Sequence, residues 1–164
     1  MTAQEIIRHL GLVPLPMEGG FYRETFRSEW NLSGPALPPG YPGARSGYTA
    51  IYYLLTPETS SALHRLRGDE VWHFYLGDPA EQIQLRADGT TRTVRLGQDL
   101  TAGEQLQVRV PAGAWQSTRL AAGGRFALMG TTMAPGFDFA DYEHGRIEEL
   151  SGPYPALRCW LASA

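Results

Sequence analysis

The pattern of hydrophobic and polar positions changes from a helical period to a strand period near residue 20. Thr2 and Glu5 have the spacing of a capping box, and the apolar residues that follow fall on one helical stripe that ends at Gly11. This segment predicts one short N-terminal helix. After residue 20, short runs rich in β-branched and aromatic residues alternate with Gly, Pro and Asp. These runs span residues 21–26, 49–55, 61–64, 71–76, 82–85, 92–96, 105–110, 115–119 and 126–132.

Turn residues between these runs indicate how the strands connect. Asp88-Gly89 has the chemistry of a tight hairpin turn and should join 82–85 to 92–96. The segment 31–47 contains four Pro and four Gly, which excludes a helix or a central strand. It is either an exposed loop or a lid or oligomer contact beside a barrel. Many short strands at near-regular spacing are typical of a sandwich or a barrel, so the sequence predicts an all-β fold.

Composition adds limits to this picture. The 164 residues suit one domain, spanning 1–164, and 43% apolar with 19% charged residues is typical of a globular chain. The net charge is -3 and the basic residues are scattered, so we expect neither a nucleic-acid polymer nor a membrane as partner. Charged residues interrupt the first ten positions, which argues against a signal peptide and predicts a cytoplasmic protein. The single cysteine, Cys159, excludes an intrachain disulfide and a Cys-rich metal site.

The run that begins at Glu70 carries the first candidate chemistry. Strand alternation places Glu70, Trp72 and Phe74 on one face and His73 on the other. A carboxylate with two aromatic rings is a common lining of a small-molecule pocket. The alternative is a carboxylate at a strand edge above an ordinary aromatic core. His73 should pack outside the barrel or in an interface.

Two short motifs give a resemblance to the cupin superfamily. The first cupin motif resembles His-x-His-x3,4-Glu-x6-Gly, and this chain has His64, Leu66 at the second histidine, Glu70 and then Gly77. The second motif contains Pro-x-Gly followed by a histidine, and here Pro111-Ala112-Gly113 is followed by Gln116. The resemblance implies a double-stranded β-helix, the jelly-roll barrel of the cupins, with a short N-terminal helix.

The same two motifs bear on a metal cofactor. Leu66 cannot coordinate a metal, and a neutral Gln amide binds transition metals poorly compared with imidazole. We therefore expect no cofactor. A divalent metal, if one were bound, would have His64, Glu70 and Gln116 as its ligands.

A third segment resembles a different group of jelly rolls. The run 18–26 is similar to the Gly-Phe-Phe-x-Glu strand of the dTDP-4-keto-sugar 3,5-epimerases, which are metal-free and bind a nucleotide sugar partly across a dimer. The resemblance implies that Phe21 and Arg23 bind ligand and that the protein is a homodimer. Those epimerases have an Arg where this chain has Gly19, so Arg23 would have to replace it from the opposite strand face. Nearly the whole chain resembles a small cupin group of unknown function.

Several further residues are candidates for the pocket. His64 next to Glu70 suits a general base with an orienting carboxylate, although a buried structural histidine is the alternative. Alternation allows only one of Tyr52 and Tyr53 to face the barrel interior, where a phenol without a structural partner would be an acid. Trp115 and Arg119 complete the ligand-binding candidates, Arg119 as a contact for an anionic group.

Three functions fit these residues. The first is a metal-independent isomerase or epimerase acting on a sugar or nucleotide sugar, with His64, Glu70 and Tyr53 as catalytic residues. The second is a non-catalytic module that holds a small ligand against aromatic side chains. The third is a metal-dependent cupin enzyme with a degenerate metal site.

Overall fold

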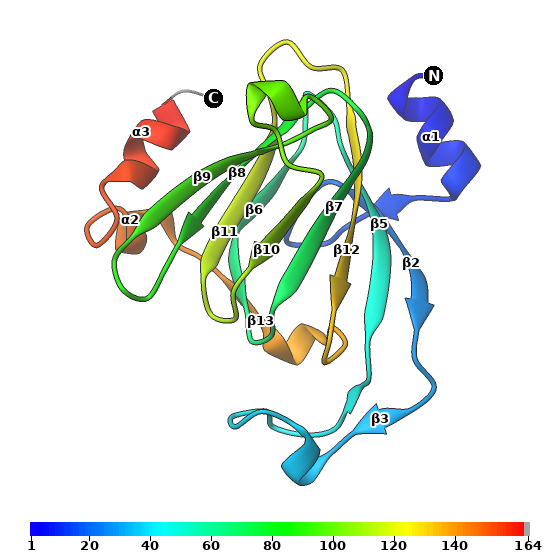
Figure 1. Cartoon of the computed structure of the whole chain (residues 1–164), viewed down its shortest axis with the longest axis vertical. Coiled ribbons are helices and arrows are strands. Elements are labelled where there is room, and N and C mark those ends of the chain that lie inside the picture. The colour runs from blue at the N-terminus through cyan, green and yellow to red at the C-terminus, as the bar shows by residue number, and fades with distance from the viewer. Residues whose placement is uncertain (163–164) are drawn as a thin grey trace.

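Two antiparallel β-sheets face each other and enclose the main core, as the computed structural model of the chain shows for residues 1–162 (Figure 1). The first sheet has the strand order β1–β2–β5–β12–β7–β10 and the second β13–β6–β11–β8–β9. The strands are β1 (Val13–Pro14), β2 (Phe21–Arg27), β3 (Asn31–Leu32), β4 (Arg45–Ser46), β5 (Thr49–Leu55), β6 (Ser60–Leu66), β7 (Glu70–Gly77), β8 (Ala80–Leu85), β9 (Thr91–Leu96), β10 (Gln107–Val110), β11 (Trp115–Leu120), β12 (Ala127–Met133) and β13 (Tyr142–His144). The helices are α1 (Ala3–Leu10), α2 (Ile147–Leu150) and α3 (Ala156–Ala162), with short 3-10 turns at Gly34–Ala36, Leu100–Ala102 and Phe139–Asp141.

This architecture confirms the predicted all-β jelly roll with a short N-terminal helix. Each predicted strand is present, and its ends lie within two residues of the predicted ends. The capping box forms, with the Glu5 backbone N–H donating to Thr2 Oγ1 and the Thr2 backbone N–H to Glu5 Oε2. Gly11 ends α1 with a positive φ of 61°. Gly89 takes a φ of 83° in the turn between β8 and β9, as the hairpin requires.

The outer faces of the two sheets carry helices on opposite sides of the barrel (Figure 1). Helix α1 packs Ile6 against Leu54 on the first sheet. Helix α3 packs Leu157 and Trp160 against the second sheet. Neither α2 nor α3 was predicted from the residue pattern. Each helix has at most seven residues and lies near Gly or Pro, so its helical period is too short to recognise. Among the residues described, no helix is long and apolar enough to cross a membrane.

The segment 31–47 projects from one end of the barrel, with β3 paired to β4 at its base (Figure 1). As predicted, it contains no helix longer than one 3-10 turn and no central strand. The buried Arg45 guanidinium donates to both carboxyl oxygens of Asp141, at 2.6 and 2.8 Å, and Arg67 donates to the same carboxyl at 3.1 Å. Tyr41 lies against both guanidinium groups. These contacts fix the segment to the barrel.

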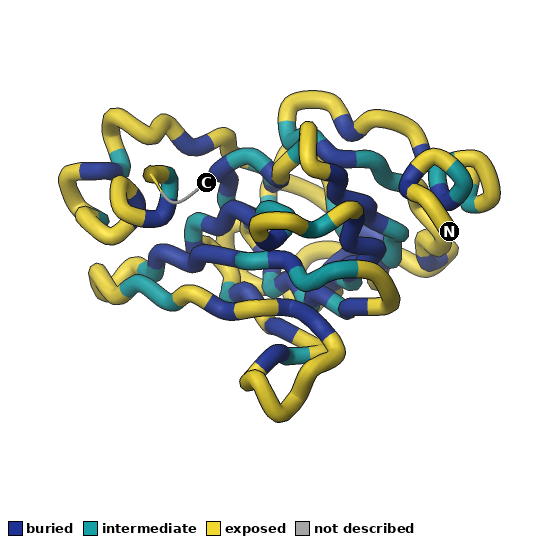
Figure 2. Tube along the Cα trace, turned by 90° about the horizontal axis from the view of Figure 1, so that it is seen from above, coloured by how far each residue is buried: buried dark blue, intermediate teal, exposed yellow. Residues whose placement is uncertain are grey.

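Buried residues are concentrated along the strands at the centre of the molecule, and exposed residues lie mainly on the loops around them (Figure 2). Part of this interior is polar. His64, Gln116 and Gln84 are register partners on neighbouring strands of the second sheet, and each is at most 1% exposed. The barrel therefore contains an apolar core and a buried polar row of His64, Gln116 and Gln84. Two residues of this row, His64 and Gln116, lie next to the candidate site.

Candidate functional site

Strand β5 decides which tyrosine enters the barrel. Tyr53 is 1% exposed and belongs to the inner core with Trp72, whose ring it meets edge-on at 5.4 Å. Tyr52 points outward and packs beside α1 and against Tyr75. The Tyr53 hydroxyl donates to the carbonyl oxygen of Gly19 at 2.8 Å. Burial raises the pKa of this phenol well above 10, so Tyr53 stays protonated and already has a structural partner. The condition on which it was expected to act as an acid is therefore not met.

Glu18 enters the barrel on the loop before β2, and two glycines make its approach possible. A Cβ on Gly19 would lie 2.5 Å from the Ser60 carbonyl oxygen, and one on Gly20 would lie 2.7 Å from the Tyr53 hydroxyl. Both glycines also have positive φ angles, 91° and 70°. The Ser61 hydroxyl donates to Glu18 Oε1 at 2.9 Å. Burial raises the pKa of the Glu18 carboxyl to about 7.

His64 is buried on β6 beside this carboxyl. Its Nδ1 lies 2.7 Å from the Ala62 carbonyl oxygen, which assigns the ring proton to Nδ1. The other nitrogen, Nε2, therefore carries a lone pair and lies 4.0 Å from Glu18 Oε2. Burial lowers the pKa of His64, although the nearby Glu70 carboxyl opposes the effect. The imidazole is thus neutral at pH 7, and Tyr142 stacks on it at 5.3 Å.

Glu70, at the start of β7, is held by two donors. Gln116 Nε2 donates to Glu70 Oε2 at 2.7 Å, and the Trp72 indole N–H lies 3.0 Å from both Glu70 Oε2 and Gln116 Oε1. The carboxyl is 6% exposed. Burial raises its pKa, and the nearby Glu18 carboxyl raises it further. His64, Glu70, Trp72 and Gln116 thus lie together inside the barrel, as the sequence predicted.

A cavity of about 410 Å³ opens next to these groups, between the first sheet and the segment that follows β12. It is lined by Leu15, Glu18, Tyr22, Glu24, Arg27, Thr49, Ile51, Tyr53, Leu66, Glu70, Trp72, Thr131, Met133, Phe137, Asp138 and Phe139. Of the residues expected in the site, Tyr53, Glu70 and Trp72 line it. His64 and Gln116 lie behind the lining and reach it through Glu18 and Glu70, and Phe74 belongs to the apolar core.

The face of strand β2 that lines the cavity is not the one expected from the sequence. Phe21 packs toward α1, and the Arg23 guanidinium lies over the outward ring of Tyr52, at 5.7 Å. Phe21 and Arg23 thus lie outside the cavity, which contradicts their expected placement, and Tyr52 is the tyrosine of the alternative pair that lies outside. The inward side chains are instead Tyr22 and Glu24, because the edge strand turns that side to the barrel.

The bulge between Glu24 and Phe26 then shifts the alternation by one residue, so that Arg27 also reaches the cavity. The sequence analysis named none of the inward residues of β2. The pair of glycines after Glu18, which permits the close approach of that loop, was the one signal that pointed to this carboxyl.

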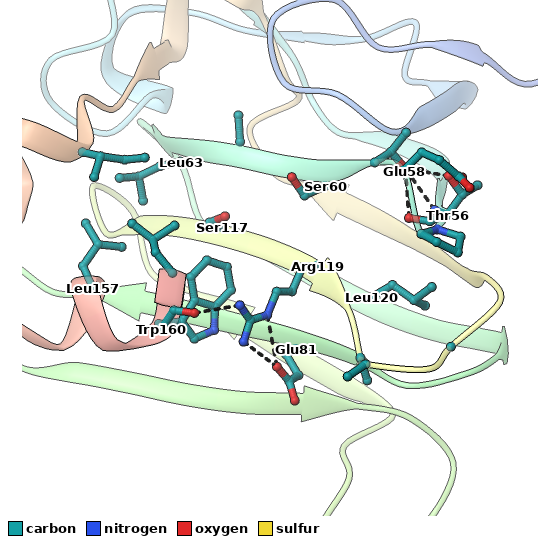
Figure 3. Close-up of a pocket in the computed structure, with 18 of the residues that line it drawn as sticks. Thr56, Glu58, Ser60, Leu63, Glu81, Ser117, Arg119, Leu120, Leu157 and Trp160 are labelled. Carbon is teal, nitrogen blue, oxygen red and sulfur yellow. Dashed lines mark hydrogen bonds and ion pairs between the residues drawn. The ribbon is translucent and has the colours of Figure 1, made fainter. Parts of the chain in front are cut away.

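Trp115 and Arg119 also lie outside the barrel, contrary to expectation. Strand β11 turns Gln116 inward, so alternation turns its odd-numbered neighbours outward. Arg65 stacks over the Trp115 ring at 4.6 Å. Arg119 stacks on Trp160, donates to that residue's carbonyl oxygen at 2.7 Å and contacts Glu81 (Figure 3). Arg119, Glu81 and Trp160 line an outer groove of about 650 Å³ between the second sheet and α3. His73 faces outward, as predicted, and lies 2.9 Å from Thr132 Oγ1.

The donor set of the site does not suit a transition metal. Leu66 occupies one position of the cupin ligand set and lines the cavity with an aliphatic side chain. The oxygen of Gln116 accepts the indole N–H of Trp72, while its amide nitrogen points to Glu70. Among the described residues, no three His, Cys, Asp or Glu side chains gather where they could hold a metal ion. In this part of the chain, the imidazole of His64 and the carboxyl groups near it are not gathered closely enough to make more than a weak site.

A jelly-roll barrel with a cavity beside its first sheet, and with the landmarks of both cupin motifs next to that cavity, defines a protein of the cupin class. Residues 4–145 match the family model described as Cupin superfamily (DUF985), and the chain belongs to this family.

Three relatives illustrate the match. The chain is similar to a hypothetical protein from Leishmania major, with 35% identity, a TM-score of 0.85 and coverage of 95% of this chain and 94% of that one. It is also similar to a protein of known structure from Shewanella oneidensis, with 35% identity, a TM-score of 0.82 and coverage of 97% and 94%. An uncharacterized protein of Saccharomyces cerevisiae is 28% identical over 151 residues, which is 85% of this chain and 75% of that protein.

Proposed function

We propose that the cavity binds a small carbonyl compound such as a sugar and that Glu18 moves a proton on it without a metal ion, which makes the protein an isomerase. One observation carries the proposal. The Glu18 carboxyl lines the cavity, burial raises its pKa to about 7, and a neutral imidazole lies 4.0 Å away. A carboxyl that titrates near neutral pH takes up and returns a proton within one turnover.

The roles proposed here differ from those expected from the sequence. His64 does not line the cavity, so Glu18 takes its place as the base. His64 becomes a positioning residue that keeps a lone pair directed at the Glu18 carboxyl. Tyr53 is bound to the Gly19 carbonyl and supports the Glu18 loop. Glu70 lines the cavity with a raised pKa and is the group suited to pass a hydroxyl proton.

The proposed step conserves atoms and electrons. The Glu18 carboxylate removes a proton from the carbon next to the carbonyl group, and the electrons of that C–H bond form the C=C bond of an enediol. The protonated carboxyl returns the proton to the former carbonyl carbon, while a hydroxyl proton passes between the two neighbouring oxygens through Glu70. The carbonyl group has then moved by one carbon, and no oxidant is consumed. A single base on one side of the ligand suits isomerisation better than epimerisation, which needs an acid on the opposite face.

Solvent-exchange NMR tests the proposal. The protein is incubated in D2O with a panel of aldoses, ketoses and amino sugars, and the proton next to the carbonyl carbon is followed. We expect deuterium to replace that proton in one member of the panel. Glu18→Gln should slow the exchange about 100-fold to 10,000-fold, the usual loss for a general base. Glu148→Gln, the same change at an exposed site on α2, should leave it unaltered.

A ligand that binds in the cavity without any exchange would contradict the proposal and favour the second candidate, a binding module without catalysis. The aromatic lining of the cavity favours that candidate, because Tyr22, Trp72 and Phe137 offer flat apolar surfaces to a ligand. The two functions therefore predict the same binding but opposite exchange results.

We also propose that the protein is a cytoplasmic homodimer that pairs through β2. Within the described part of the chain, only the two-residue β1 pairs with the outer edge of β2, at Tyr22 and Phe21, and residues 23–27 have no neighbouring strand on that side. Phe26 is 46% exposed next to that edge and stacks on Tyr48. An open edge with exposed aromatic rings is a typical site for strand pairing with a second copy.

A further inference from the structure

The charge of the barrel cavity is strongly one-sided. Its lining includes four carboxyl side chains, those of Glu18, Glu24, Glu70 and Asp138, and one guanidinium group, that of Arg27. Glu70 is 6% exposed and faces the cavity. In the described part of the chain, no arginine forms an ion pair with Glu18, Glu70 or Asp138. Three of the four carboxyl groups in the lining therefore have no arginine as an ion-pair partner and are available to a cationic ligand.

Arg27 is not free to bind an anionic ligand. Its Nε and Nη2 donate to the two carboxyl oxygens of Glu24, at 3.0 and 2.7 Å. Its Nη1 donates to Ser46 Oγ and to the Phe137 carbonyl oxygen, each at 3.1 Å. These contacts use four of the five N–H donors of a guanidinium group. A phosphate would have to break the pair with Glu24 and then lie beside that carboxylate.

The walls of the cavity suit a cation. Tyr22, Tyr53, Trp72, Phe137 and Phe139 surround the carboxyl groups with aromatic rings. The faces of such rings attract an ammonium group, and the attraction is stronger where water is excluded. Carboxylates combined with aromatic rings bind an ammonium group both by charge and by contact with its methylene neighbours.

We infer that the cavity selects a small ligand that carries an amine, such as an amino sugar, over neutral and anionic ligands of the same size. This inference rests on the proposed function and names its substrate class. It narrows the earlier choice between a sugar and a nucleotide sugar, because a pyrophosphate would meet four carboxyl groups in the cavity and one guanidinium group that is already paired with Glu24. Arg23, the residue expected to receive a pyrophosphate, lies on the outer face of the sheet.

Three ligands that share the glucose ring and differ in charge test the inference: D-glucosamine, D-glucose and D-glucose 1-phosphate. Their dissociation constants are measured by ligand-detected NMR and by calorimetry. We expect glucosamine to bind at least about tenfold more tightly than glucose, which corresponds to about 1.4 kcal/mol, and glucose 1-phosphate to bind most weakly. Glucosamine that binds no better than the other two ligands, or that does not bind, would overturn the inference.

Two variants connect the preference to particular carboxylates. Glu24→Gln leaves Arg27 without its counter-charge, so the ratio of glucosamine to glucose 1-phosphate affinity should fall by at least about tenfold. Asp138→Asn removes one negative charge from the cavity lining and should lower the affinity for glucosamine alone. Glu148→Gln, at an exposed site outside the cavity, should change neither value. If the two cavity variants behave like this control, the carboxylates do not select the ligand.

The outcome separates this inference from the proposed function. If a proton of a neutral sugar exchanges and amines are not preferred, the isomerase function is supported and the charge selectivity is refuted. If amines bind tightly and selectively but no proton exchanges, the charge selectivity is supported and the isomerase function is refuted.

Discussion

Replacing Glu18 by Gln should make the protein more stable above pH 7 and leave its stability almost unchanged near pH 4.5. The side chain of Glu18 is 14% exposed and has a hydroxyl donor, Ser61, but no cation to compensate its negative charge. Burial therefore raises the pKa of the carboxyl from its ordinary 4.5 to about 7. Gln keeps an oxygen that can accept from Ser61, and it cannot ionise, so it imitates the protonated acid.

The magnitude follows from the two pKa values. The folded protein binds the Glu18 proton more tightly than the unfolded chain does, so the folded state is favoured below pH 4.5 and this advantage is lost as the pH rises to about 7. Each pH unit between the two values corresponds to about 1.4 kcal/mol, which gives a total of about 3 kcal/mol. For a chain of this size, that difference moves the melting temperature by roughly 6 to 12 °C.

The assay is urea unfolding of both proteins at pH 4.5, 6 and 8, with the free energy of unfolding compared at each pH. His64, whose pKa is lowered by burial, favours unfolding at acid pH in both proteins, so its contribution largely cancels in the comparison. Glu148→Gln is the matched control and should show no change in its stability difference with pH. A Glu18→Gln difference that is the same at all three pH values would show that Glu18 ionises normally in the fold, and the proposed general base would lose its physical basis.

Three other changes have expected outcomes. Phe74→Ala should lower the free energy of unfolding by about 3 to 5 kcal/mol, because it empties part of the barrel core. His64→Ala should lower the free energy of unfolding by less and should abolish isomerase activity. Equal losses of stability in the two variants would show that the role of His64 is structural. Phe26→Arg should convert the proposed homodimer to a monomer in light scattering, and a wild-type monomer at micromolar concentration would refute the dimer. The purified protein should contain less than about half an equivalent of any transition metal by elemental analysis, since the site offers one imidazole, and Leu66 and Gln116 stand where two further ligands would be needed. A stoichiometric metal that resists chelation would favour the metal-dependent enzyme.

Local sequence signals were enough for the N-terminal helix and the nine longer strands, and the resemblance to cupins supplied the barrel that they form. The capping box at Thr2, the turn at Asp88-Gly89 and the period-two runs specify where the helix and strands begin and end, because they depend on contacts within a few residues. Alternation also placed Glu70 and Trp72 on one face of β7 and His73 on the other, and the spacing of the cupin landmarks placed His64 and Gln116 beside them.

Alternation divides a strand into two faces, but it does not say which face lies inside the barrel. For this reason Arg23 was expected in the pocket, and Tyr52 stayed an alternative to Tyr53, although the barrel turns both Arg23 and Tyr52 outward. Trp115 and Gln116 were both expected there, which two neighbouring residues of one strand cannot satisfy. The bulge in β2, which brings Arg27 to the cavity, has no signature in the residue pattern.

The amino-acid sequence by itself therefore determined the N-terminal helix, the nine longer strands of the barrel and the residues of β7 that carry the site. The tertiary structure decided which faces meet inside the barrel and brought Glu18, from a loop before the first long strand, to His64 and Glu70 more than forty positions later. It also decided the chemistry of that carboxyl. A pKa near 7 arises from the removal of water around the group and from its distance to other charges, and both depend on packing between segments that the chain alone leaves far apart.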